Sequence, residues 1–150
     1  MPQFRDNLPP GARTFEVQQT VQWADVDAAG IIYFVAYWRF QELAEMRFFE
    51  ELGFPYGSVF DDFDFWFPRV RTEAEYYAPA LMGDVIRARL HLEKVGASSV
   101  RWRTVLFNES TGVVAAAITM TVACMNRRTR ASMPIPPPIR AALVEAAVTE

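Results

Sequence analysis

One long helical pattern followed by a series of alternating patterns is the feature that most limits how this chain can fold. Between Val35 and Leu52, apolar residues recur on one face of an α-helix, and Gly53 and Pro55 supply a stop signal. About 18 residues make a helix of about 27 Å. A single helix of this length cannot bury its apolar stripe alone, so other elements must cover it.

Segments on both sides of this helix alternate between apolar and polar residues, which is typical of half-buried strands. The first begins at Phe15, and others follow at about residues 70–76, 86–93 and 100–106. Residues 113–125 are apolar on both parities, as expected of a central strand that is covered on each face. We therefore predict an α+β fold in which a curved antiparallel sheet wraps around one long helix.

The chain has 150 residues and no internal repeat, which indicates a single domain over residues 1–150. Residues 1–12 are expected to form an N-terminal arm, and residues 133–150 a proline-rich segment with a short final helix. The acid-rich stretch 55–64 is expected to be a loop.

Composition excludes several classes of function. The net charge of −3 and the pI of about 5.2 give no overall basic field for nucleic acid. A single cysteine (Cys124) and a single histidine (His91) predict no disulfide framework and no metal site. The N-terminus lacks an apolar signal segment, and the longest apolar stretch is too short to span a membrane, so we expect a cytoplasmic protein without membrane contact.

The junction between the first strand and the long helix carries the most distinctive motif. Residues 25–37 are Asp-Val-Asp-Ala-Ala-Gly-Ile-Ile-Tyr-Phe-Val-Ala-Tyr. Aspartate and glycine before a helix are ordinary turn and capping residues, so a purely structural role is one interpretation. The other is that the turn presents a carboxylate to a substrate.

This motif resembles the hotdog-fold acyl-CoA thioesterases, in the branch typified by 4-hydroxybenzoyl-CoA thioesterase and the Tol–Pal-associated short-chain enzyme. A second family feature is the turn over residues 76–84, Tyr-Tyr-Ala-Pro-Ala-Leu-Met-Gly-Asp, and the resemblance covers about residues 14–136. It implies a hotdog fold, hydrolysis of an acyl-CoA thioester and a homodimer or homotetramer. It implies no cofactor, since coenzyme A is part of the substrate.

The resemblance also implies roles for individual residues. Asp27 would be the catalytic nucleophile or the general base. The amide of Phe34, aided by that of Val35, would stabilise the oxyanion at the helix N-terminus. Gly30 would permit a close backbone approach or a positive φ. Asp25 is expected to be mainly structural.

Substrate contacts are expected at a further set of residues. Tyr33 and Tyr37 are interpreted as pocket or interface packing. Arg127, Arg128 and Arg130, here called the arginine cluster, could contact the phosphates of coenzyme A or could serve only surface solubility. Lys94 is a weaker candidate for the same contact.

Departures from the family pattern limit what carries over. Ala28 replaces a proline of the hydroxybenzoyl branch, and Phe34 replaces a histidine that is catalytic in the Tol–Pal branch. A phenyl ring cannot exchange a proton, so a mechanism that needs this histidine cannot operate here. Val95 and Gly96 also stand where the hydroxybenzoyl branch has an arginine pair.

Other chemically capable residues have simpler interpretations. Glu42 and Glu45 fit a solvated helix face, His91 an exposed strand position, and Cys124 a small buried apolar residue. The aromatic stretch 60–67 either closes the core or lines an acyl tunnel. Two further functions stay open, namely release of a product from an acyl carrier protein and non-catalytic binding of acyl-CoA.

Overall fold

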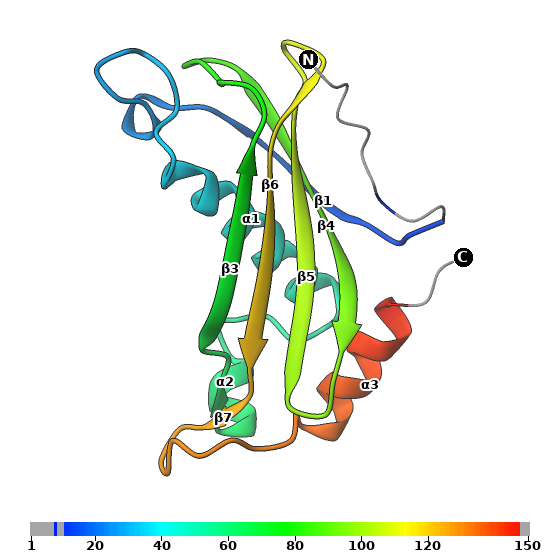
Figure 1. The fold of residues 1–150 in the computed structure, drawn as a ribbon. Coiled ribbons are helices and arrows are strands. Elements are labelled where there is room, and N and C mark those ends of the chain that lie inside the picture. The colour runs from blue at the N-terminus through cyan, green and yellow to red at the C-terminus, as the bar shows by residue number, and fades with distance from the viewer. Residues whose placement is uncertain (1–7, 9–10, 148–150) are drawn as a thin grey trace.

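The computed structural model describes residue 8 and residues 11–147, so most of the expected N-terminal arm lies outside the described residues. One layer is a five-stranded antiparallel sheet with the order β1-β4-β5-β6-β3. Its strands are β1 (Phe15–Thr20), β3 (Arg69–Tyr76), β4 (Val85–Val95), β5 (Ser99–Asn108) and β6 (Val113–Ala123). Helix α1 (Ala36–Glu51) lies against one face of this sheet (Figure 1). The expected α+β fold is confirmed.

Smaller elements occupy the ends of the molecule. They are the short helices η1 (Trp23–Asp25) and α2 (Val59–Phe63), the strands β2 (Phe65–Trp66) and β7 (Met125–Asn126), and the C-terminal helix α3 (Pro137–Ala146). Strands β2 and β7 pair with each other. Helix α2 falls within residues 55–64, where a loop was expected, so that prediction was wrong for five residues. No helix in the described part of the chain has the length and apolarity to span a membrane.

The core lies between α1 and the sheet. Phe48 and Trp102 are fully buried, with ring centroids 6.5 Å apart, and Phe40 and Leu90 are also buried. Each such side chain stabilises the fold by about 1.5–3 kcal/mol relative to an exposed position. The helix ends where Gly53 adopts a φ of 87°, as its stop signal predicted.

The aromatic stretch 60–67 mostly joins this core. Phe65 and Phe67 are buried, and Phe60 packs between them and Tyr56. Trp66 is 42% exposed. These contacts support the core interpretation over the tunnel interpretation.

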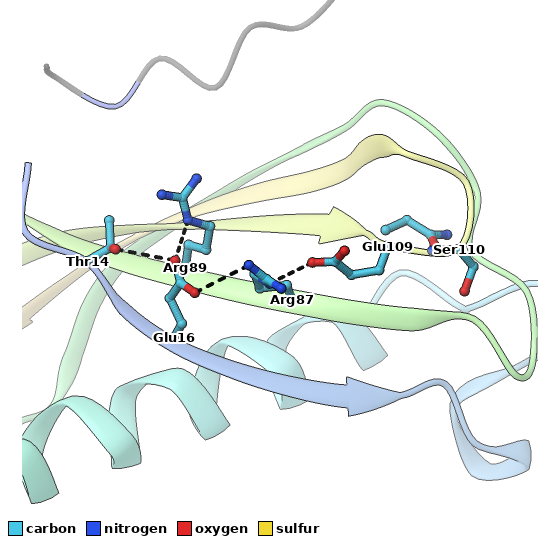
Figure 2. Close-up of polar contacts among 7 residues, drawn as sticks. Thr14, Glu16, Arg87, Arg89, Glu109 and Ser110 are labelled. Atoms are coloured by element: carbon cyan, nitrogen blue, oxygen red, sulfur yellow. Dashed lines mark hydrogen bonds and ion pairs between the residues drawn. The ribbon is translucent and has the colours of Figure 1, made fainter.

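The sheet face opposite α1 carries a chain of ion pairs (Figure 2). Glu16 of β1 lies 2.7 Å from Arg89 and 3.7 Å from Arg87, both on β4. Arg87 also lies 2.6 Å from Glu109, which follows β5. The network connects three successive strands, and its carboxylates neutralise arginines that could otherwise attract phosphate.

Candidate active site

The segment between η1 and α1 folds into a short hairpin. Its arms meet at a bridge between Val26 and Ile32, and the amide of Asp27 donates to the carbonyl of Ile31 (3.0 Å). The turn closes where the amide of Gly30 donates to the carbonyl of Asp27 (3.0 Å). Gly30 has a φ of 76°, a conformation that disfavours residues with a Cβ. Here the structure has the positive φ that the sequence suggested for this glycine.

Asp27 is the first residue of this turn, and its side chain is exposed. One carboxylate oxygen accepts a hydrogen bond from the amide of Ala29 (2.8 Å). This is an Asx-type turn, the structural role that the sequence left open. The second oxygen has no partner among the described residues, so the carboxylate is held at one oxygen and accessible at the other.

The start of α1 provides backbone donors. Val35 occupies the N-cap position without a side-chain cap, and the amides of Phe34 and Val35 have no acceptor within residues 11–147. Both residues are at least half exposed. The carbonyl of Phe34, by contrast, accepts a hydrogen bond from the Tyr76 hydroxyl (3.3 Å). Free amides at a helix N-terminus are a ready site for negative charge.

The two tyrosines of the motif have different environments. Tyr33 is 40% exposed, whereas Tyr37 is buried. Burial raises the pKa of Tyr37, and its ring centroid lies 5.3 Å from that of Tyr76. Tyr37 therefore remains protonated at neutral pH. Its expected role in a substrate pocket or at a subunit interface stays a prediction.

The second family motif lies directly beside the hairpin. The amide of Ile32 donates to the carbonyl of Ala80 (2.8 Å), and Ile31 forms a bridge with Leu81. Asp84 fixes the turn by accepting from the amide of Leu81. Two distant parts of the chain thus lie side by side at the Ile31–Ile32 arm of the Asp27 hairpin.

The arginine cluster lies at the opposite end of the molecule, next to β7 and α2 (Figure 1). Arg127 lies 2.6 Å from Asp61 and stacks over Trp66, and Arg128 is 3.4 Å from Asp64. Arg130 follows in the same loop, with a φ of 60°. Within one chain, the structure does not bring the arginine cluster together with Asp27.

Two expectations about titratable residues were wrong. Glu45 is fully buried, because it lies on the core face of α1 and is paired with Arg69. His91 is 5% exposed, and it lies on β4, against which α3 packs. Cys124 is buried as expected, and burial raises the pKa of its thiol to about 11. Within the described ranges, no group of three or more possible ligand side chains is placed to hold a metal.

Sequence reasoning also missed Arg39, which pairs with the buried Asp25. The available signal was weak, since an arginine on the second turn of a helix is usually solvated. The burial of Glu45 had a better signal in the sequence, because Phe48 and Phe49, three and four residues later on the same helix face, are both apolar.

Comparison with known proteins identifies the family. The sequence profile of the thioesterase-like superfamily matches residues 21–143. The chain belongs to this superfamily. The chain is also 30% identical over 131 residues to a 1,4-dihydroxy-2-naphthoyl-CoA hydrolase of Thermosynechococcus vestitus, covering 87% of this chain and 89% of that protein.

Solved structures agree with this membership. A gentisyl-coenzyme A thioesterase is 27% identical, with a TM-score of 0.76 over 85% of this chain and 98% of the other. A 1,4-dihydroxy-2-naphthoyl-CoA thioesterase from Synechocystis has a TM-score of 0.81 at 22% identity, covering 88% and 96% of the two chains. The predicted hotdog fold and thioesterase family are confirmed.

Proposed function

We propose that this protein hydrolyses an acyl-CoA thioester with an aromatic acyl group. The observation that carries the proposal is that a free carboxylate oxygen of Asp27 and the free amides of Phe34 and Val35 belong to one hairpin and the helix it leads into. The relatives named above are hydrolases of aromatic acyl-CoA thioesters. Exposed aromatic side chains at Tyr33, Phe34 and Tyr76 suit a planar acyl group.

Two routes lead from this geometry to hydrolysis. In the first, Asp27 attacks the thioester carbonyl carbon, the carbon–sulfur bond breaks, and water then hydrolyses the resulting anhydride. In the second, Asp27 removes a proton from water, and the water oxygen attacks the same carbon. In both, the carbonyl oxygen gains negative charge, which the Phe34 and Val35 amides would stabilise. Coenzyme A leaves as a thiolate.

We also propose that the active form is a dimer. Strand β3 is an edge of the sheet, and within the described chain its outer edge is unpaired. Val70 and Tyr76 on this strand are 59% and 46% exposed, and the Tyr76 hydroxyl donates to the carbonyl of the exposed Phe34. An unpaired edge with apolar neighbours favours pairing with a second copy. Assembly of dimers into tetramers stays a prediction.

Such a dimer would complete the site. Strand β3 runs from the end that carries β7 toward the end that carries the start of α1 (Figure 1). If two copies pair antiparallel through β3, the arginine cluster of one copy lies at the Asp27 end of the other. The side chain of Arg128 is 85% exposed and lies 3.4 Å from Asp64, whereas Arg127 lies 2.6 Å from Asp61, so Arg128 can exchange its carboxylate partner for a phosphate more readily. This arrangement would unite the predicted residues that one chain keeps apart.

Thiol release from a panel of short, long and aromatic acyl-CoAs tests the proposal. We expect turnover on an aromatic member and a loss of about 10²–10⁴-fold in kcat for Asp27→Asn. Asp62→Asn, which neutralises another exposed aspartate, is the matched control and should keep wild-type kcat. Near-wild-type turnover by Asp27→Asn would rule out the carboxylate mechanism.

The same assay separates the remaining alternatives. Arg128→Ala should raise KM for acyl-CoA, and more so at low salt, while Arg47→Ala, an exposed arginine on α1, should not. Turnover only with substrates on an acyl carrier protein would favour the carrier-protein function. Tight binding of acyl-CoA without turnover on either donor would favour a binding protein.

A further inference from the structure

The buried carboxylate of Asp25 is at the centre of a set of contacts beside the proposed site. Asp25 is 3% exposed. One oxygen accepts from Nε of Arg39 (2.8 Å), and the other accepts from Nη2 of Arg39 and from the amide of Gln22 (2.8 Å). Its backbone carbonyl accepts from the amide of Tyr33 (3.1 Å). One residue therefore contacts three separate segments of the chain.

These contacts keep Asp25 charged. Burial alone would raise the pKa of this carboxyl, but the hydrogen bonds from Arg39 and Gln22 and the charge of Arg39 outweigh it, so the pKa lies below its ordinary value. Arg39 is itself oriented by packing over the ring of Phe40, 4.6 Å from the ring centroid. The pair is thus a bidentate salt bridge, which fixes the orientation of the two side chains as well as their separation.

The Asp25–Arg39 salt bridge lies next to the residues of the proposed chemistry. Asp25 lies two residues before Asp27 on one arm of the hairpin, and Tyr33 lies directly before Phe34 on the other. Arg39 belongs to α1, and the proposed oxyanion donors are the amides of Phe34 and Val35, the two residues directly before this helix. The Asp25 contacts therefore join the arm that carries the carboxylate to the arm and the helix that carry the amides.

We propose that Asp25 and Arg39 are positioning residues that set the place of the Asp27 carboxylate relative to the Phe34 and Val35 amides. This inference rests on the proposed thioester hydrolysis. Neither side chain touches the reacting atoms, and both act through the hairpin. A displacement of about 1 Å at a reacting centre can lower a rate by about 10²-fold, so the pair affects kcat more than substrate binding.

A purely structural ion pair would behave differently, and α1 supplies the comparison. At its other end the hydroxyl of Tyr56 donates to the buried carboxylate of Glu45. Tyr56→Phe removes that contact far from the hairpin and serves as the matched control. It should lower stability without a selective effect on kcat.

The experiment measures kcat, KM and backbone amide hydrogen exchange for wild type, Arg39→Gln, Arg39→Lys and Tyr56→Phe. For Arg39→Gln we expect kcat to fall by about 10–10²-fold with KM within about threefold of wild type. Exchange should accelerate at the hydrogen-bonded amides of Asp27, Gly30 and Tyr33 beyond any change in global unfolding. Arg39→Lys keeps the positive charge but not the bidentate guanidinium, so it should restore part of the kcat and part of the protection from exchange.

Two results would overturn the inference independently of each other. Unchanged exchange at these three amides in Arg39→Gln would show that the pair does not position the hairpin, whatever the activity. A loss of kcat no larger than that of Tyr56→Phe would show that the position does not matter for the reaction. Absence of wild-type turnover on every acyl-CoA would instead overturn the proposed function, and the exchange data would still decide whether the pair holds the hairpin.

Discussion

Arg69 of the edge strand β3 reaches Glu45 of α1 with both ends of its guanidinium, and both nitrogen–oxygen distances are 2.7 Å. Gln41 and Tyr56 donate to the same carboxylate. The two charges are not equally buried, since the side chain of Glu45 is 0% exposed and that of Arg69 is 40% exposed. This asymmetry decides how the pair responds to substitution.

Arg69→Met should therefore destabilise the fold more than Glu45→Gln. The first leaves a buried carboxylate without its cation, which costs about 3–5 kcal/mol, while the second leaves an arginine that can turn to water. Urea unfolding at one fixed protein concentration measures both, and Arg71→Met, which breaks an exposed pair with Glu73, should change stability by less than about 1 kcal/mol. Equal losses for Arg69→Met and Glu45→Gln would contradict the argument.

The loss in Arg69→Met should also depend on pH. Burial raises the pKa of Glu45 in the folded protein, so the folded state holds this proton more tightly than the unfolded chain does. Stability from this group is then fully present below the unfolded pKa and falls as pH rises through the folded pKa. Because the variant lacks the opposing cation, its deficit relative to wild type should be smallest at acidic pH and grow toward neutrality.

Asp25 should show the opposite dependence. Its folded pKa lies below the ordinary value of 3.8, so its contribution to stability is present above that value and disappears as pH falls through the lower folded pKa. The difference in unfolding free energy between wild type and Asp25→Asn should thus be constant from about pH 5 to 7 and shrink in strong acid. Urea titrations across this range check it, with Asp62→Asn, a substitution of an exposed aspartate, as the comparison.

Gly30→Ala should lower the free energy of unfolding by about 1–2 kcal/mol, because the left-handed conformation is less favourable by this amount for a residue with a Cβ. The site offers free space, because a Cβ at Gly30 would meet no atom within 4 Å, so backbone strain alone is measured. Gly30→Asn should cost less. Thermal unfolding compares these variants with Gly57→Ala, where space is also free and no positive φ is required. A loss at Gly57 equal to that at Gly30 would show that φ is not the cause.

Val70→Lys should weaken the proposed dimer. It places a charge on the unpaired edge of β3, where a second copy would pair. Sedimentation velocity reports the assembly state. Val144→Lys, the same substitution at an exposed position of α3, is the control. Loss of the dimer in Val144→Lys together with its retention in Val70→Lys would show that the interface does not involve β3.

Much of this fold could be predicted because its signals are local. The apolar spacing around Phe40 and Phe48 predicted α1 to within one residue at each end. Alternation predicted β1, β3, β4 and β5, and a run apolar on both parities predicted β6. Helix α2 was missed because five residues do not show a helical period. The pairing of Glu45 with Arg69 was missed because the arginine lies on another element, 24 residues away, and periodicity along one segment does not reveal such a partner.

The candidate site was predictable in part for a similar reason. Asp27, Gly30 and Phe34 lie within one short motif, so its residue types identify them together. The arginine cluster lies at the other end of the sheet, and its expected contact with coenzyme A stays a prediction. The Asp25–Arg39 salt bridge was not predicted, because the residue types alone do not show that two charged side chains on either side of the hairpin meet.

The pairing of β1 with β4 has a consequence for the order in which the chain folds. Strands β4, β5 and β6 are joined by short turns, whereas Phe15 of β1 pairs with Leu90 far along the sequence. Closing the long connection loses more chain entropy, so we expect the central hairpins to form first and β1 to dock later. The Asp27 hairpin follows β1 and is held by the bond from Ile32 to Ala80. Thioesterase activity should therefore appear late in refolding, together with pulse-labelled protection of the Ile32 amide and after that of β5.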